Sequence, residues 1–103
     1  MSEARFAPRA LEELRRAAAW IAADNPDAAD GFLDAVDRAA TMVGRRPALG
    51  RVRLDLAPAR YRFWSLRGYP YILVFDVESD PPTVARVLHQ ARDLPALLDD
   101  LDT

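Results

Sequence analysis

The sequence predicts an α+β fold, in which an N-terminal helical hairpin packs on an antiparallel β-sheet. Two observations predict it. Apolar residues recur at helical spacing in two stretches between residues 8 and 44, and the pattern then changes to extended apolar runs. The expected order is β-α-α-β-β-β followed by a short C-terminal helix. Because one core is all that 103 residues can build, we expect a single domain spanning residues 1–103.

The first half of the chain predicts the hairpin. Residues 4–7 suit a short edge strand, and Pro8 suits the first turn of a helix, where its missing N–H is not needed. Asn25 can cap a second helix, with Pro26 at its first position, and Gly44 is expected to end it. The two apolar stripes are Leu11, Leu14, Ala18 and Ile21, and then Ala29, Phe32, Leu33, Val36, Ala40 and Val43. Their short link predicts an antiparallel pair.

The second half predicts the sheet. Residues 51–56 alternate charged and apolar side chains, which favours an extended segment with one buried face. Residues 61–66, 71–77 and 83–88 are expected to be strands, the second of them central. Asp93 can cap a final helix that contains Leu94, Leu97, Leu98 and Leu101. Only that helix is available to cover the second sheet face, so we expect this face to receive a partner or substrate.

Composition narrows the function classes. The chain has no cysteine, which excludes disulfides and thiolate metal sites, and we expect no metal or cofactor. No apolar run is long enough for a signal peptide or a membrane span, so we expect a cytoplasmic protein. The formal net charge of −2 argues against nucleic acid as the main partner, although every basic side chain other than the one histidine is arginine. The central arginines are Arg45, Arg46, Arg51, Arg53, Arg60, Arg62 and Arg67.

The segment 83–94 carries the clearest candidates for chemistry. His89 is the only histidine and ends a predicted strand, and its ordinary pKa suits acid–base work near neutrality. Arg86 and Arg92 can supply positive charge. Residues three apart on a strand point to opposite faces, so we do not expect Arg86 and His89 to converge unless a bulge intervenes. A structural role for His89, capping the strand, stays open.

Five further residues are candidates for binding a target or partner. They are Arg60, Arg62, Trp64, Arg67 and Trp20. The alternative is structural: these arginines form a solvated strand face, and the aromatic residues, together with Phe63, pack the hairpin against the sheet. Arg92 and Asp93 likewise have a structural reading, with Asp93 capping the helix and Arg92 paired to a carboxylate.

Several short segments, in a fixed order, resemble one known family. They are Phe6 to Ala10 with Leu14, Asn25-Pro26 with Ala28 and Ala29, Pro47 with Gly50, Arg62, Pro70 to Phe75, and Arg86 to His89 with Arg92 to Leu94. Over nearly its whole length the chain resembles the RelE/ParE superfamily of small bacterial toxins, on the ParE side. The resemblance implies the toxin of a type II toxin-antitoxin system, of the kind found in plasmid stabilisation.

The resemblance implies three alternative functions. A ParE-like toxin inhibits DNA gyrase by binding and is neutralised by a ParD-like antitoxin, through which alone it meets DNA. A RelE-like toxin is a ribosome-dependent mRNA endoribonuclease, for which Arg62, Arg86, His89 and Arg92 are the candidates. A third kind forms the complex without toxicity. Because Ile72 stands about where the nucleases place a basic residue, we expect no enzyme. If His89 and two guanidinium groups gather around one phosphate-sized hollow, the non-catalytic hypothesis must be abandoned.

Overall fold

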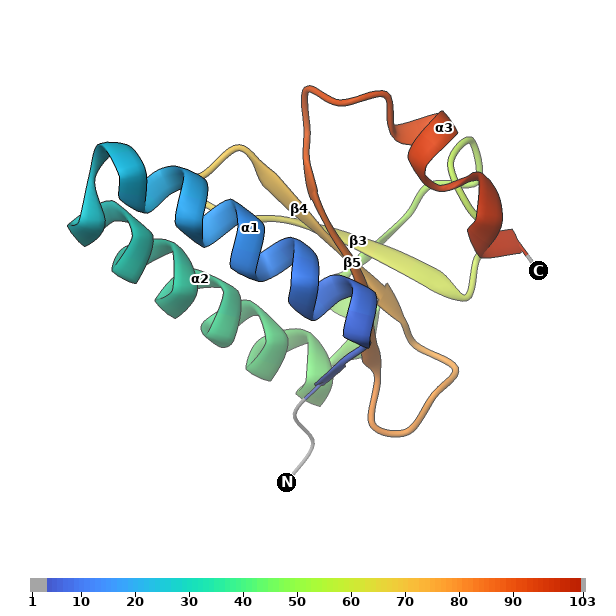
Figure 1. Cartoon of the computed structure of the whole chain (residues 1–103). Helices are drawn as coiled ribbons and strands as arrows, with labels where there is room; N and C mark the ends of the chain where they lie inside the picture. The colour runs from blue at the N-terminus through green and yellow to red at the C-terminus, as the bar shows by residue number, and fades with distance from the viewer. Residues whose placement is uncertain (1–3, 103) are drawn as a thin grey trace.

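The computed structural model describes residues 4–102, in which two long helices lie side by side across one face of a sheet (Figure 1). The helices are α1, Pro8–Asp24, and α2, Pro26–Arg45. The strands are β1 (Arg5–Phe6), β2 (Arg51–Val52), β3 (Tyr61–Ser65), β4 (Tyr71–Asp76) and β5 (Thr83–His89). Short helical turns complete the chain: η1 (Pro47–Leu49), α3 (Leu94–Leu97) and η2 (Asp99–Asp102). The predicted α+β fold with its helical hairpin is confirmed.

The sheet has the strand order β1-β5-β4-β3-β2. Strands β2 to β5 pair antiparallel, as predicted, whereas β1 joins the edge of β5 in parallel, with Arg5 opposite Thr83 and Phe6 opposite Val84. The sheet is therefore mixed. A parallel pair needs a long connection, and here that connection is nearly the whole chain. A two-residue strand carries no pattern from which its direction can be predicted.

The hairpin depends on the Asn25-Pro26 link. Asn25 Oδ1 accepts the N–H of Ala28 at 3.2 Å, and Pro26 occupies the first position of α2, so both predictions are confirmed. The prediction that Gly44 ends α2 is wrong, because Gly44 is buried inside the helix, which continues to Arg45. Pro47 ends it instead: the residue before a proline is pushed out of the helical region, and Arg46 has φ −135° and ψ 77°.

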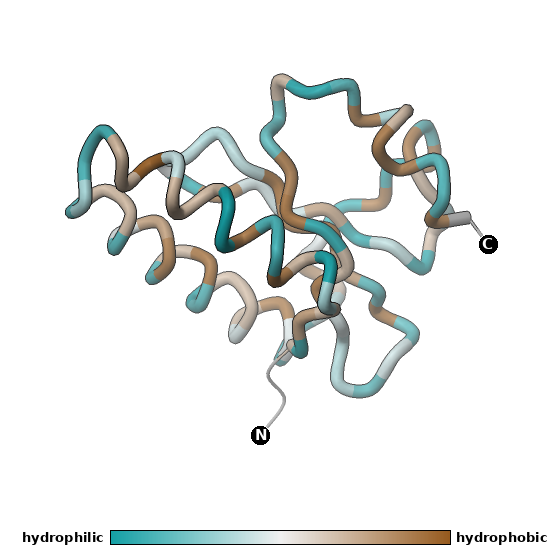
Figure 2. Tube along the Cα trace, viewed as in Figure 1, coloured by the Kyte–Doolittle hydropathy of each residue, from teal (hydrophilic) through white to brown (hydrophobic). Residues whose placement is uncertain are grey.

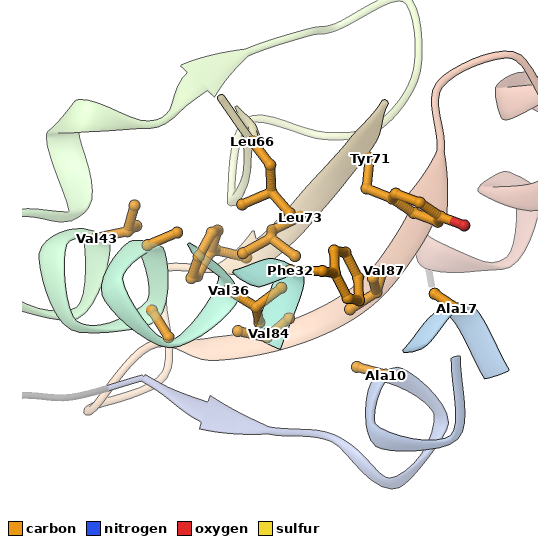
Figure 3. Close-up of a cluster of buried hydrophobic side chains, with 13 residues drawn as sticks. Ala10, Ala17, Phe32, Val36, Val43, Leu66, Tyr71, Leu73, Val84 and Val87 are labelled. Atoms are coloured by element: carbon orange, nitrogen blue, oxygen red, sulfur yellow. The ribbon is translucent and has the colours of Figure 1, made fainter. Parts of the chain in front are cut away.

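The main core lies between the hairpin and the sheet. Phe32 of α2 is fully buried and its ring meets those of Tyr69 and Tyr71 at centroid distances of 5.6 and 5.0 Å. Figure 3 shows Phe32 among Leu73, Val87 and neighbouring side chains from both layers. Burying such a side chain stabilises the fold by roughly 1.5–3 kcal/mol as an upper estimate. Apolar residues accordingly recur along both helices, with hydrophilic ones between them (Figure 2).

The second sheet face is covered, contrary to expectation. Leu98 is 1% exposed and packs in a cluster with Phe63, Val74 and Leu88, and the segments around Ala57 and α3 lie over it. The apolar spacing of residues 94–101 fills this face, so it is not free for a partner. Asp93 caps α3 as predicted, because its Oδ1 accepts the N–H of Ala96 at 3.5 Å.

The extended segment predicted for residues 51–56 is mostly a turn. Only Arg51–Val52 form a strand, and Val52 and Leu54 are 41% and 73% exposed, so the predicted buried face is wrong. The chain turns where the Leu56 N–H donates to the Arg53 carbonyl at 2.9 Å. The turn ends the alternation after Val52.

Within residues 4–102, no helix combines the length and apolarity that crossing a bilayer requires.

Candidate functional site

A hollow of about 760 Å³ lies between α1 and the C-terminal half of β5. We call it the α1–β5 hollow. It contains three of the four residues predicted as nuclease candidates, together with one predicted binding residue. Its main lining residues are Arg9, Glu13, Arg16 and Trp20 from α1, Arg86 and His89 from β5, Tyr71 from β4, and Arg92.

The hollow exists because the edge of β5 is only partly covered by β1, which pairs with Thr83 and Val84 alone. Beyond Val84 the edge of β5 faces α1 instead of another strand. There the backbone N–H of Val87 donates to Glu13 Oε1 at 2.9 Å. The Glu13 carboxylate thus replaces the carbonyl that a neighbouring strand would offer, which satisfies a donor that would be costly to leave unpaired.

Arg86 is buried at the same place, with 3% of its side chain exposed. Its Nε and Nη2 donate to Glu13 Oε2 at 3.0 and 2.7 Å, and its Nη1 donates to the Leu97 carbonyl at 2.6 Å. A buried guanidinium needs such partners, because removing a charge from water is costly unless it is paired. The hydrogen-bonding capacity of Arg86 is directed into the protein, so this side chain is poorly placed to hold a phosphate.

His89 closes the end of β5. Its ring lies edge-on to Tyr71, with centroids 5.1 Å apart, and its Nδ1 accepts the N–H of Ala91 at 3.1 Å. In the neutral ring, Nδ1 is therefore the acceptor and Nε2 carries the proton. The contact agrees with the structural reading of His89 at the strand end. Within residues 4–102, Nε2 has no hydrogen-bond partner and stays available as a donor.

Arg86 and His89 both line the α1–β5 hollow, but they make different contacts there: Arg86 bonds Glu13 and Leu97, and His89 lies against Tyr71. The bulge in β5 lies opposite Val74 and Phe75, before Arg86, so the two side chains still alternate along the strand. Arg86 nevertheless lines the hollow because its long side chain reaches Glu13 at the open edge.

The remaining cations of the hollow are mostly paired. Arg9 bonds Asp100 at 2.6 Å, and this hydrogen bond lowers the pKa of the Asp100 carboxyl. Arg16 lies 3.9 Å from Glu12. Arg92 is exposed and, contrary to its structural reading, has no ion pair in the described part of the chain. His89, Arg86 and Arg92 line one hollow, but the Arg86 guanidinium is bonded to Glu13 and Leu97, so two available guanidinium groups do not gather beside His89 as the nuclease hypothesis requires. In residues 4–102, no three His, Asp or Glu side chains cluster as metal ligands.

Arg62, the fourth nuclease candidate, lies away from the hollow. Its Nη1 donates to the Gly50 carbonyl at 3.2 Å, and its Nε is buried without a partner in the described residues. Gly50 allows this approach, since a Cβ there would lie 2.5 Å from the Arg62 Cβ. Arg60 bonds Asp76 at 2.8 Å, which raises the pKa of the Arg60 guanidinium. Arg62 is therefore held against Gly50, whereas the side chain of Arg60, paired to Asp76, is 40% exposed.

The two aromatic candidates, Trp20 and Trp64, lie in different parts of the structure. Trp20 is 79% exposed at the rim of the α1–β5 hollow, whereas Trp64 is half-buried between α2 and β3, beside the exposed Arg67. Sequence reasoning did not single out Arg38 and Met42, which line the hollows beside Trp64. The available signal was their spacing of four on a helix, which places them on one face.

The structure is that of a small α+β protein with a charged hollow between α1 and β5. A family model described as the ParE toxin of a type II toxin-antitoxin system, parDE, matches residues 4–94, and the chain belongs to this family. The chain is also similar to a solved structure from the chromosomal ParDE toxin-antitoxin system of P. aeruginosa, with 16% identity and a TM-score of 0.70. That likeness covers 86% of this chain and 96% of the other. No curated protein sequence matches significantly.

Proposed function

We propose that the chain inhibits DNA gyrase by binding to it, and that a cognate ParD-like antitoxin neutralises it. Membership of the ParE toxin family, over residues 4–94, supports the toxin role. Gyrase is the target that the ParE branch implies. Because both proposed partners are cytoplasmic, the toxin would act in the cytoplasm. The net charge of −2 is consistent with a toxin that contacts DNA only through its antitoxin.

The observation that best supports a binding mechanism is that the Arg86 guanidinium is already hydrogen-bonded within the protein. RNA cleavage needs a proton donor together with cations that stabilise charge on the phosphate. The only nearly buried arginine in the hollow, Arg86, already bonds Glu13 and Leu97, and Arg62 lies elsewhere. A binding mechanism requires a shaped surface and no such convergence, so it suits this arrangement better.

One observation favours the second candidate, a RelE-like endoribonuclease. His89 and Arg92 line the same hollow, and neither His89 Nε2 nor the Arg92 guanidinium has a partner within residues 4–102. Together they offer one N–H donor and one cation. A nuclease built this way would need further cations from the ribosome.

Induced expression without antitoxin separates these functions in cells. The proposal predicts growth arrest with gyrase-linked DNA breaks and intact transcripts, for the wild type and for His89→Ala alike. Transcript cleavage that His89→Ala abolishes, with the variant still folded by circular dichroism, would establish the nuclease instead. Unimpaired growth with a stable, folded product would indicate the third alternative, a member that forms the complex without toxicity.

A further inference from the structure

The most exposed large apolar side chain in residues 4–102 is that of Trp20, which is 79% exposed near the end of α1. The core does not depend on this ring, because Ala17, one turn earlier, is the buried residue of this part of α1. A single exposed apolar residue is ordinary on a protein surface, as Leu54 shows at 73%. Trp20 differs from Leu54 in position, because it lies at the rim of the α1–β5 hollow. Trp20 is therefore a candidate for contact with a partner that enters the hollow.

The charges around this hollow do not cancel. Four arginines line it, and three carboxylates oppose them, including that of Asp100, which bonds Arg9. The excess positive charge lies on two side chains. Arg92 has no ion pair in the described part of the chain, and Arg16 is 82% exposed and lies 3.9 Å from Glu12. The hollow is thus locally positive on a protein of net charge −2, and it favours an acidic partner.

These two arginines flank the indole of Trp20. Arg16 and Trp20 are four residues apart on α1, so their side chains lie next to each other on one face of the helix. Arg92 belongs to the other wall of the hollow, because it follows the end of β5 at His89. Tryptophan and arginine are among the side chains that most often dominate the binding energy of a protein interface. The rim of the hollow therefore has the composition of a binding hot spot.

The floor of the hollow is held in place before any partner binds. Arg86 bonds the Glu13 carboxylate and the Leu97 carbonyl, and the His89 ring lies edge-on to Tyr71. A preformed concave site accepts a folded partner with little backbone change and at a small cost in ordering. The hollow, of about 760 Å³, therefore suits side chains that project from a folded protein better than a segment that must first fold upon it.

We propose that the chain binds gyrase through the rim of the α1–β5 hollow, which receives an acidic projection of the folded enzyme. Trp20 would be the apolar anchor, and Arg16 and Arg92 would pair with carboxylates on either side of it. This inference rests on the proposed function, since it takes gyrase as the target. The second sheet face is not available for this role, because the segment that carries Leu98 covers it. His89 belongs to the floor of the hollow, so binding does not depend on its imidazole.

The test uses two variants of the rim and a matched control for each. Trp20→Ala removes the anchor, and its control is Leu54→Ala, at an exposed apolar residue that does not line the hollow. Arg92→Glu reverses a charge of the rim, and its control is Arg15→Glu, at an exposed arginine of α1 that does not line the hollow either. Circular dichroism confirms that each variant folds, and Arg92→Gln replaces Arg92→Glu if the latter does not fold.

Each protein is titrated against purified gyrase, with the affinity measured by biolayer interferometry and the inhibition measured in a supercoiling assay. We expect Trp20→Ala and Arg92→Glu to weaken gyrase binding by roughly tenfold or more, and the controls to change it by less than about threefold. The wild-type affinity should fall as salt is raised, and less steeply for Arg92→Gln, because one screened charge pair is then absent. Affinity for the purified protein encoded by the gene beside that of the toxin is measured in parallel.

The outcomes separate this inference from the function beneath it. If either rim variant binds and inhibits gyrase as well as the wild type does, the inference is wrong, although the proposed function stands. If the rim variants bind gyrase normally but lose the protein encoded by the neighbouring gene, the hollow belongs to the antitoxin and the assignment of the occupant is overturned. Weakened binding of both partners would support the inference and show that they compete for the rim. If the wild type does not bind gyrase at all, the proposed function fails and the inference fails with it.

Discussion

The carboxylate of Glu13 on α1 and the guanidinium of Arg86 on β5 form a buried ion pair, with Oε2 and Nη2 2.7 Å apart. The same carboxylate accepts the Val87 N–H, and the same guanidinium donates to the Leu97 carbonyl. Two side chains thus join the hairpin, the edge of the sheet and the C-terminal segment. These contacts stabilise the fold. They also occupy the Arg86 guanidinium, so that it is poorly placed to bind a phosphate at the surface.

Removing one partner of this pair should destabilise the protein strongly. Glu13→Gln leaves the Arg86 charge, which is 3% exposed, with only the more distant Asp100 carboxylate, 4.0 Å from its Nη1, and we expect the free energy of unfolding to fall by about 3 kcal/mol. Adding Arg86→Met to that variant should recover part of the loss, because the buried charge is then gone. Urea unfolding of the two single variants and the double variant measures this. Additive losses would show that the two side chains act independently.

The cap of α2 should account for a measurable part of the stability. Asn25→Ala removes the acceptor of the Ala28 N–H and should lower the free energy of unfolding by about 1 kcal/mol, while Asn25→Asp, which keeps an acceptor, should be nearly neutral. Asp93→Ala should cost less, because its bond to Ala96 is 3.5 Å long and α3 has four residues. Thermal unfolding followed by circular dichroism compares the three. Equal losses for Asn25→Ala and Asn25→Asp would contradict the capping role.

The hydroxyl of Tyr69 occupies the space where a side chain at position 31 would begin. Gly31→Ala in the wild type should therefore gain little, because the helix preference of alanine, about 1 kcal/mol over glycine, is offset by displacement of that hydroxyl. In a Tyr69→Phe background the obstructing atom is absent, so the same substitution should stabilise α2 by roughly that full amount. A double-mutant cycle in urea gives the difference. The same effect in both backgrounds would mean that Tyr69 does not restrict this position.

The Arg9–Asp100 ion pair should make stability depend on acid pH. The Arg9 hydrogen bond lowers the pKa of Asp100 in the folded protein below its ordinary value of 3.8, so the unfolded chain takes up the proton first as the pH falls. The contribution is complete above pH 3.8 and is lost as the pH falls through the lower folded value. Asp100→Asn should flatten the acid limb of stability against pH, measured from pH 6 downward. An unchanged limb would indicate that the pair is fully screened by solvent.

Local chemistry allowed much of the fold to be predicted from the sequence. Asn25-Pro26 determined the hairpin link, and Asp93 determined the start of α3, because a cap involves residues only three positions apart. The family resemblance, built on short ordered segments, is confirmed by the match over residues 4–94.

Contacts between residues far apart in the chain could not be predicted from sequence patterns. Glu13 and Arg86 are 73 residues apart, and nothing in a stripe of helix residues marks one glutamate as the partner of a strand edge. The alternation that predicted a buried Leu54 failed because a turn intervened after Val52. Likewise Arg86 and His89 line one hollow because β1 is too short to cover β5, which the residue pattern of the strand does not reveal.

The most direct test of the central claim, inhibition of gyrase by binding without catalysis, is a supercoiling assay with purified gyrase and the purified chain. The account predicts dose-dependent loss of supercoiling, to the same extent with the wild type and with His89→Ala, and relief when the antitoxin is added in equal amount. Gyrase that stays fully active at excess toxin, while ribosome-bound mRNA is cut by the wild type and spared by His89→Ala, would contradict it.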